Sequence, residues 1–217
     1  MIRAENIHKS YEDVKVLKGI DLVIPEGKTV AIMGKSGAGK STLLHILGTL
    51  DNPDQGKVYI EDQLVAGLKS KELAKIRNEK IGFVFQFHHL LNEFSAVENV
   101  AIPAMVHSSN KTEAFEKAKK LLKYLELGHR LEHKPNEMSG GEQQRVAFAR
   151  ALVNSPKVVF ADEPTGNLDQ GTSEEVHNLI QKLKHELNQT FVIVTHDAYL
   201  AQVCDITFDI VEGRIVE

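Results

Sequence analysis

The sequence predicts an α/β protein with a mostly parallel sheet, and three observations support that prediction. Short apolar segments alternate with segments whose apolar residues recur at helical spacing, as in strands joined by helices. A glycine-rich motif of the phosphate-binding type stands between such a strand and such a helix, at residues 34–41. The segment 157–161 is expected to be a continuous apolar strand, which is typical of a strand buried on both faces of a sheet.

The composition is that of a soluble globular protein. The 217 residues are 42% hydrophobic and 26% charged, with 26 basic and 30 acidic residues and a net charge of -4. No Lys/Arg block dominates, so the composition does not indicate nucleic-acid binding. No apolar stretch approaches the roughly 20 residues of a membrane helix, there is no signal-peptide run, and the single Cys204 excludes an internal disulfide. We expect a cytoplasmic protein that reaches a membrane only through a partner.

The N-terminal part is predicted to be rich in strands, the first of which form an antiparallel β part. The expected strands up to residue 85 are 2–11, 17–24, 30–33, 58–60 and 81–85. A helix is expected at 41–50, because Leu43, Leu44, Ile46 and Leu47 recur at helical spacing. The third strand therefore runs through a glycine-rich turn into a helix.

The middle of the chain is predicted to be a mostly helical insertion. Residues 113–125 have an amphipathic helical pattern, and Gly128 is placed to stop that helix. After the insertion we expect a helix at 172–187 and these strands: 157–161, 191–194 and 206–210. The prediction is a single domain with its core at 1–86 and 156–217 and the insertion at about 87–155.

The motif at residues 34–41 fits G-x-x-x-x-G-K-[ST] in full, and its strand and helix supply the context that the motif requires. The glycines let the backbone fold closely around phosphates, and the helix adds its positive N-terminal end. Lys40 should reach the β- and γ-phosphates, and the Ser41 hydroxyl should ligate Mg²⁺. The predicted nucleotide-binding residues of the loop are Gly34, Lys35, Ser36, Gly37, Ala38, Gly39, Lys40, Ser41 and Thr42.

Asp162 and Glu163 stand at the carboxyl end of a buried strand, where α/β sheets bind ligands. An ATP site needs one carboxylate to hold Mg²⁺ through water and another to orient and deprotonate the attacking water. We assign the first role to Asp162 and the second to Glu163. His196 follows another apolar strand and is expected at the same sheet edge, in reach of the γ-phosphate. In isolation the acid pair would be an ordinary solvated turn and the histidine a structural one, so the upstream phosphate motif decides the interpretation.

Residues 138–145, Met-Ser-Gly-Gly-Glu-Gln-Gln-Arg, resemble the signature motif of ABC transporter ATPases and lie between the phosphate loop and the catalytic strand, as in that family. The resemblance covers essentially the whole chain and implies a P-loop NTPase (RecA-like) core. It implies that Tyr11 stacks on adenine and that Gln86 reaches Mg²⁺ and senses a transmembrane partner. It also implies that Asp169 belongs to the D-loop and that His196 is the switch histidine.

The family resemblance also implies a head-to-tail homodimer that encloses two ATP molecules. Each nucleotide would lie between the phosphate loop of one chain and the signature residues of the other, which are Ser139, Gly140, Gly141 and Glu142. Phosphate binding by these residues is also physically reasonable, because they precede a helix expected at 143–152 and form a second helix N-terminus for phosphate. Met138 and Glu142 depart from the commonest pattern, which has leucine and glutamine there.

The stretch 163–169 resembles the subfamily of lipoprotein-releasing (LolD-type), macrolide-export (MacB-type) and cell-division (FtsE-type) ATPases. Within it, residues 85–91, 98–100 and 129–135 look most like the lipoprotein-releasing branch. This implies a Mg-dependent ATPase that energises transmembrane permease subunits at the cytoplasmic face of the inner membrane. The macrolide- or peptide-export type and the non-transporting cell-division type remain alternatives. A soluble ABC ATPase acting on DNA or ribosomes would need a long coiled coil or a second ATPase half, and 217 residues hold neither.

The contact with the membrane partner is predicted in the segment 86–106. This segment has more apolar groups than a short surface segment normally presents. They are Phe87, Leu90, Leu91, Phe94, Val97 and Val100.

Overall fold

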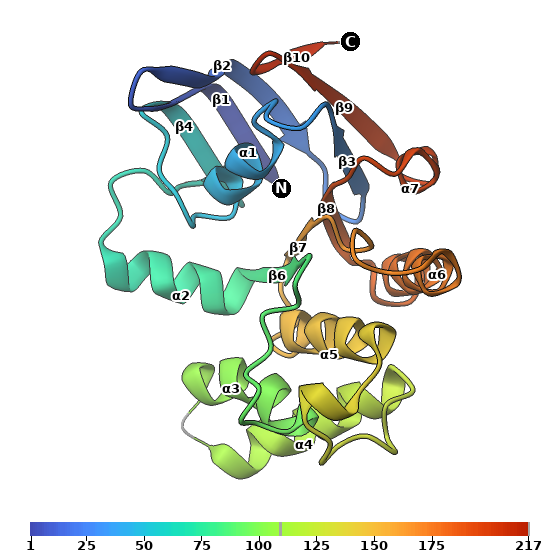
Figure 1. The fold of residues 1–217 in the computed structure, drawn as a ribbon. Helices are drawn as coiled ribbons and strands as arrows, with labels where there is room; N and C mark the ends of the chain where they lie inside the picture. The colour runs from blue at the N-terminus through green and yellow to red at the C-terminus, as the bar shows by residue number, and fades with distance from the viewer. Residues whose placement is uncertain (109, 217) are drawn as a thin grey trace. The chain divides into compact units, whose positions relative to one another are not determined.

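The computed structural model describes residues 1–108 and 110–216, and the chain forms two compact units (Figure 1). The first unit is Met1–Arg77 with Lys184–Glu217, and the second is Asn78–Leu183. Helix α2 (Ser70–Lys80) begins in the first unit and ends in the second. Each unit is described by itself.

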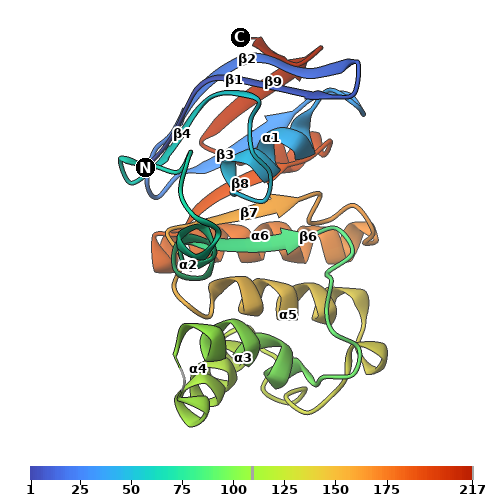
Figure 2. The same ribbon diagram turned by 90° about the vertical axis from the view of Figure 1, so that its left-hand side faces the viewer.

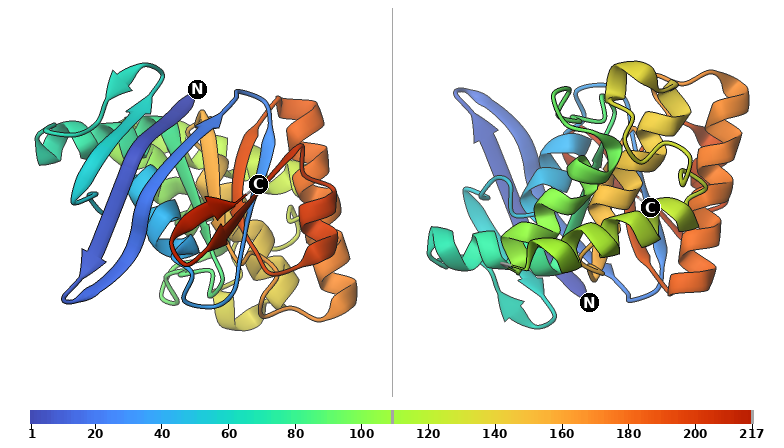
Figure 3. Two further views of the ribbon diagram at one scale, coloured as in Figure 1. Left: turned by 90° about the horizontal axis from the view of Figure 1, so that it is seen from above. Right: turned by 90° about the horizontal axis from the view of Figure 1, so that it is seen from below.

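An antiparallel sheet forms the N-terminal part of the first unit. Its order is β2-β1-β4-β5, and the left view of Figure 3 shows its longer strands in blue and cyan. The strands are β1 (Ile2–Tyr11), β2 (Val14–Ile24), β4 (Gln55–Ile60) and β5 (Gln63–Leu64). Ile2 pairs with Ile24 on one side and with Ile60 on the other, and all three side chains are buried. The predicted antiparallel β part is confirmed.

A mostly parallel group of strands forms the rest of the sheet structure of this unit. β3 (Thr29–Met33) pairs in parallel with β8 (Thr190–Val194) and with β9 (Ile206–Val211), and β10 (Arg214–Val216) adds an antiparallel edge. All of β8 and nearly all of β3 are buried, as expected for strands covered on both faces. The helices that begin in this unit after these strands are α1 (Lys40–Leu47) and α7 (Ala198–Gln202).

The second unit contains the parallel strands β6 (Ile81–Phe85) and β7 (Val158–Asp162), followed by α6 (Gln170–Leu187), which ends in the first unit. The Phe83 and Phe160 rings stack between the strands with centroids 5.6 Å apart. The register pairs Phe85 with Asp162, so both strands end at the same level.

Helices make up most of the remainder of the second unit. They are α3 (Ala96–His107), α4 (Lys111–Tyr124), the 3-10 helix η1 (Pro135–Glu137) and α5 (Gly140–Leu152). α3 packs on both α4 and α5, and α5 packs on β6 (Figure 2). Ser95 and Ser139 begin α3 and α5 with capping boxes that satisfy the first N–H groups of each helix.

The expectation that Gly128 stops the helix at 113–125 is wrong. α4 ends at Tyr124, and Glu126 takes the left-handed conformation with φ 66°. The Glu126 N–H donates to Lys123 O at 3.0 Å and the Leu127 N–H donates to Leu122 O at 2.8 Å, which satisfies the last carbonyls. Glycine would be the preferred residue at the left-handed position, which is occupied by Glu126. The next residue, Leu127, is buried, and its packing outweighs that backbone preference.

Candidate nucleotide-binding site

The loop at residues 34–39 is glycine-rich because side chains would not fit at its two ends. Gly34, Gly37 and Gly39 have φ values of 147°, 78° and 100°. A Cβ on Gly34 would lie 2.4 Å from Ile210 O, and one on Gly39 would lie 2.8 Å from a Leu17 methyl carbon. Nothing lies within 4 Å of the corresponding position at Gly37. The loop is therefore packed at its ends and open at its centre, as a phosphate cradle requires.

The positive groups of the loop lie on this cradle. The Lys40 Nζ donates to Gly34 O at 3.0 Å and to Lys35 O at 3.1 Å, which folds its side chain back over the loop. α1 begins at Lys40 after Gly39, and no side chain caps it. Its N-terminal dipole thus adds to the ammonium charge, and this combination suits a phosphate group.

The remaining predicted residues of the loop lie around this centre. Lys35 and Ser36 are exposed, and the Ala38 N–H donates to Lys35 O at 3.1 Å to close the turn. Ser41 and Thr42 are half-buried in the first turn of α1.

His196 follows β8 in the same unit. Val194 is level with Ile32 of β3, and the Thr195 N–H donates to Ile32 O at 3.2 Å. His196 is exposed, and Asp197 caps α7 behind it by accepting from the Tyr199 N–H at 2.8 Å. The phosphate loop and His196 therefore leave the carboxyl ends of two neighbouring parallel strands.

Tyr11 lies at the end of β1, with 48% of its surface exposed. Its hydroxyl donates to Asp51 Oδ2 at 2.7 Å. The side chain is therefore held at its polar end while much of its ring faces solvent.

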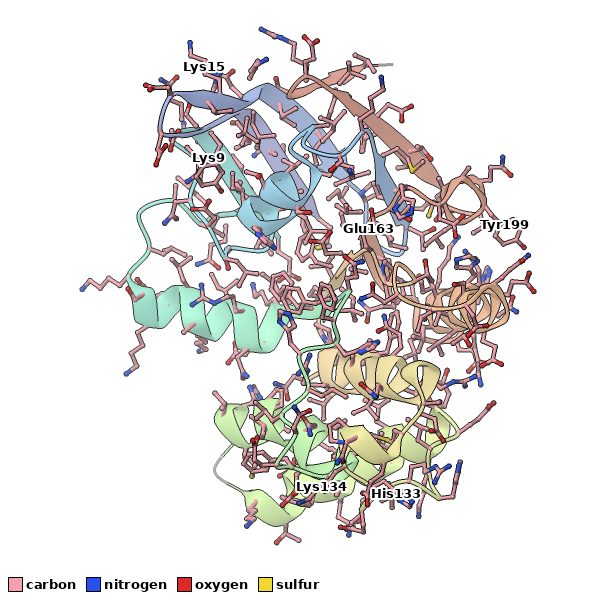
Figure 4. All side chains as sticks on the ribbon, viewed as in Figure 1. Lys9, Lys15, His133, Lys134, Glu163 and Tyr199 are labelled. Atoms are coloured by element: carbon pink, nitrogen blue, oxygen red, sulfur yellow. The ribbon has the colours of Figure 1, made fainter. Side chains whose placement is uncertain are left out.

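The acidic residues and Gln86 are in the second unit. Because Phe85 pairs with Asp162, Gln86 and Glu163 directly follow neighbouring strand ends. Asp162 and Glu163 are half-buried, and Glu163 is labelled in Figure 4. Glu163 has φ 47°, and its carbonyl accepts from the Gly166 N–H at 3.0 Å, so the chain turns sharply after β7.

A pair of hydrogen bonds joins Gln86 to the D-loop. The Gln86 Nε2 donates to Asn167 Oδ1 at 3.1 Å, and the Asn167 Nδ2 donates to Gln86 O at 3.1 Å. A Cβ on Gly166 would lie 2.8 Å from Gln86 Nε2, so a side chain there would require the Gln86 amide to move. Gln86 Oε1 takes no part in these two hydrogen bonds. The sequence alone gives no sign that Asn167 contacts Gln86.

Asp169 caps the helix that follows the D-loop. Its carboxylate accepts from the Thr172 N–H at 3.1 Å and from the Thr172 hydroxyl at 2.7 Å. These two bonds, led by the one from the hydroxyl, lower the pKa of Asp169. The D-loop is thereby joined to the start of α6.

The signature residues form the N-terminus of α5. Ser139 Oγ accepts from the Glu142 N–H at 3.2 Å, and Glu142 accepts from the Ser139 N–H at 2.8 Å. The backbone bond from Ser139, with help from Arg130 at 2.8 Å, lowers the pKa of Glu142. A Cβ on Gly141 would lie 2.7 Å from the Thr172 methyl carbon and one on Gly140 would lie 3.2 Å from Leu168, so the glycines let the D-loop segment pack closely.

An open cavity of about 310 Å³ adjoins this helix end. Its lining residues are Glu126, Leu127, His129, Ser139, Gly141, Glu142, Arg145, Thr172 and Glu175. The signature motif is thus accessible from outside the chain, and the capping interactions preform it.

Two polar residues of α5 that the sequence analysis missed connect it to other loops. The buried Gln144 donates to Pro164 O at 2.7 Å, just beyond Glu163. Arg150 donates to His88 O and to His89 O, each at 2.6 Å. A polar side chain on the buried side of a helix could have signalled these contacts, although the sequence does not name their partners.

The residues predicted to hold Mg²⁺ have the appropriate chemistry. Ser41 in the first unit and Gln86 and Asp162 in the second offer hydroxyl, amide and carboxylate oxygens, and Mg²⁺ prefers oxygen ligands. The phosphate cradle next to Ser41 fits the same requirement, because Mg²⁺ at such sites is shared with phosphate oxygens.

Comparison with known proteins is consistent with this geometry. A family model described as ABC transporter matches residues 17–166. The lipoprotein-releasing system ATP-binding protein LolD of Cytophaga hutchinsonii is 54% identical over 216 residues, covering 100% of this chain and 99% of the relative. LolD of Bacteroides thetaiotaomicron is 54% identical over 215 residues, covering 99% of each chain.

Solved structures resemble the chain along its whole length. The dimeric ATP-binding cassette MJ0796 in a post-hydrolysis state with ADP and Pi has a TM-score of 0.91 and 41% identity, covering 100% of this chain and 97% of that one. The cbiO1 subunit from Clostridium perfringens, part of the ABC transporter complex cbiONQ, has a TM-score of 0.90 and 31% identity over 100% of this chain and 86% of that one. These neighbours confirm the predicted P-loop NTPase fold, and the matched family model shows that the chain belongs to the ABC transporter family.

Proposed function

We propose that the chain is the ATP-binding and ATP-hydrolysing subunit of an ABC transporter that releases lipoproteins from the inner membrane. The observation that supports ATP binding most directly is the cradle at residues 34–39, open at Gly37 and overlaid by the Lys40 side chain. Relatives that are 54% identical over nearly their whole length carry the name of the lipoprotein-releasing system, which supports the transported class. The reported relatives favour this branch over the export and cell-division alternatives.

In the proposed reaction the first unit binds the nucleotide. Tyr11 stacks on adenine, and the loop N–H groups with Lys40 hold the β- and γ-phosphates. His196, at the end of the strand beside the loop, contacts the γ-phosphate. Charge on the transferred phosphoryl group is stabilised where these donors converge.

The second unit supplies the acid–base chemistry. Glu163 orients the attacking water and accepts its proton, and Asp162 would hold Mg²⁺ through water. Ser41 and Gln86 would complete the metal ligands, and Mg²⁺ held there would supply neutralisation of charge on the phosphate oxygens. The bonds between Gln86 and Asn167 connect this position to the D-loop.

A second copy of the chain completes each site in this proposal. Ser139, Gly140 and Gly141 at the N-terminus of α5 bind the γ-phosphate held by the partner's phosphate loop. The neighbour MJ0796 is dimeric in its solved structures, which supports a two-fold sandwich with two nucleotides. The Glu142 carboxylate accepts hydrogen bonds from the Ser139 N–H and from Arg130, and these bonds stabilise the N-terminus of α5.

The membrane connection is proposed to run through permease subunits at the cytoplasmic face of the inner membrane. Within residues 1–108 and 110–216, none of the helices has the length and apolar character needed to cross a bilayer. Phe87, Leu91 and Phe94 are 70%, 45% and 40% exposed after the end of β6, and they support docking of a permease there.

Reconstitution tests the proposal. The chain is co-purified with its permease from detergent-solubilised membranes and placed in liposomes that contain a lipid-modified lipoprotein. Release of lipoprotein should require ATP and should be lost with Lys40→Ala, because that change removes the ammonium group from the phosphate cradle. ATP hydrolysis without any lipoprotein release would refute the proposed substrate class and leave the ATPase assignment standing.

A further inference from the structure

Three side chains meet where the β1–β2 hairpin approaches the loop after α1. Asp51 accepts from the Tyr11 hydroxyl at 2.7 Å through Oδ2, and from Lys9 Nζ at 2.9 Å through Oδ1. The same Oδ1 accepts from the Asn52 N–H at 2.7 Å, which fixes the carboxylate to its own loop. Both carboxylate oxygens of Asp51 are therefore used, and one of them holds the only polar atom of the Tyr11 side chain.

Lys9 completes the support of the ring. Its side chain is only 12% exposed, and its Nζ lies 5.2 Å from the centroid of the Tyr11 ring and also donates to Asn52 O at 2.7 Å. Figure 4 labels Lys9 on β1. The cation thus lies against the ring of Tyr11, while the tyrosine as a whole stays 48% exposed.

The electrostatics favour an ionised Asp51. Partial burial raises the pKa of Asp51, but the hydrogen bonds from Lys9 and Tyr11 outweigh it and hold the pKa below its usual value. The bond to Asp51 in turn raises the pKa of Tyr11, so the phenol keeps its proton and donates it. A hydrogen bond to an ionised acceptor is stronger than a neutral one, which makes Asp51 an effective anchor.

We propose that Asp51 is a positioning residue that fixes the Tyr11 ring for stacking on the base of the nucleotide. The inference rests on the proposed function, specifically on the stacking of adenine on Tyr11. A ring held in place before binding loses less conformational freedom when the base arrives. Asp51 therefore contributes to recognition of the base and not to recognition of the triphosphate. This also explains a tyrosine at position 11, because phenylalanine could not be anchored in this way.

Equilibrium binding of two probes separates these contributions. ATP carries the base, whereas inorganic tripolyphosphate carries only the phosphate groups that the loop 34–41 holds. Asp51→Ala should weaken ATP binding about two- to tenfold, the range of one net hydrogen bond, and leave tripolyphosphate binding unchanged. Asp21→Ala is the matched control, because Asp21 accepts from the Asn6 N–H at 2.9 Å on the same hairpin and bonds neither Tyr11 nor Lys9. It should leave the affinity for both probes unchanged.

Further variants test whether Asp51 acts through the Tyr11 hydroxyl. Asp51→Asn keeps an acceptor and should restore most of the ATP affinity. Tyr11→Phe should weaken ATP binding as Asp51→Ala does, and the two changes together should cost no more than either alone. Tyr11→Phe also keeps the test decisive if Asp51→Ala fails to fold.

The contradicting outcomes are distinct. Equal loss of ATP and tripolyphosphate affinity in Asp51→Ala, or additive losses in the double variant, would overturn the positioning role. If Tyr11→Ala weakened ATP binding while Asp51→Ala did not, stacking would stand and only this inference would fail. If Tyr11→Ala left ATP binding intact, stacking itself would be wrong and the inference would fail with it.

Discussion

At the residue scale, Asp205 shows how one charged side chain joins distant parts of the first unit. It accepts from the Thr29 N–H at 2.8 Å at the start of β3 and pairs with Lys184 at 2.8 Å near the end of α6. Burial of Asp205 raises its pKa, but the hydrogen bonds from Lys184 and Thr29 dominate and hold the pKa far below the usual value. The carboxylate therefore stabilises the folded chain when ionised.

The pH dependence of stability follows from the direction of this pKa change. Because the folded pKa of Asp205 is depressed, its contribution is present above the unfolded pKa of about 3.9 and is lost as pH falls toward the folded value. Urea unfolding should show that Asp205→Asn lowers the free energy of unfolding at pH 7 and that the difference from the unchanged chain shrinks below about pH 4. A difference that stays constant down to pH 3 would contradict the assignment.

Short motifs predict residue positions well where the backbone itself imposes the residue type. The phosphate-binding loop at 34–39 was predicted from its glycines, because a tight phosphate turn needs residues without a side chain. The structure gives the steric reason at Gly34 and Gly39. Asp51 was missed because its role depends on Tyr11, which lies 40 residues earlier in the chain. A contact of that kind leaves no local pattern in the sequence.

At the element scale, α5 connects the signature motif to two loops of the second unit. Ser139 caps its start, Gln144 reaches Pro164 after β7, and Arg150 reaches the residues after Gln86. His88 and His89 both have left-handed backbones, with φ values of 58° and 49°. Arg150 holds the carbonyls of this unusual turn, which suits a role in keeping the Gln86 loop in place.

Hydrogen exchange tests the role of Arg150. Arg150→Ala should increase amide exchange in residues 86–91, because two hydrogen bonds to that loop are lost. Arg145→Ala is the control on the same helix, since Arg145 pairs with the exposed Glu126 and Glu175 instead. Unchanged exchange in residues 86–91 would show that Arg150 does not hold the loop.

The predicted permease contact at 86–106 is only partly exposed. Val97 and Val100 are buried in α3, so the expectation that they face a partner is wrong. The apolar spacing of 96–104 reflects packing of α3 on α4 and α5, and a single sequence does not separate that cause from an exposed patch. Phe87, Leu91 and Phe94 remain exposed and define the proposed docking surface.

Substitution in this docking surface should uncouple the subunit from its partner. Phe94→Asp should preserve ATP hydrolysis by the isolated chain but reduce co-purification with the permease, because a charge replaces an apolar contact. Leu187→Asp is the control, since Leu187 is 48% exposed at the end of α6. Undiminished co-purification of the Phe94→Asp chain would place the permease contact elsewhere.

At the scale of the whole molecule, the residues proposed for one reaction belong to different units and to two copies of the chain. The phosphate loop and His196 are in the first unit, whereas Asp162, Glu163 and the signature residues are in the second. The division into a core and a helical insertion at about 87–155 remains our proposal. The proposed ATP sandwich would explain why an N-terminal helix end suited to phosphate is accessible at Ser139.

The most direct test of this account is the size of the Glu163→Gln chain with and without ATP. Glutamine keeps the shape but cannot accept the water's proton, so hydrolysis should fall about 10²–10⁴-fold. ATP that is not hydrolysed should then hold two chains together, and the variant should elute from a sizing column as a dimer with ATP and as a monomer without it. Lys40→Ala added to Glu163→Gln should abolish the dimer. A Glu163→Gln chain that binds ATP, does not hydrolyse it and remains monomeric would contradict the sandwich, and one that hydrolyses ATP at the unchanged rate would exclude Glu163 as the base.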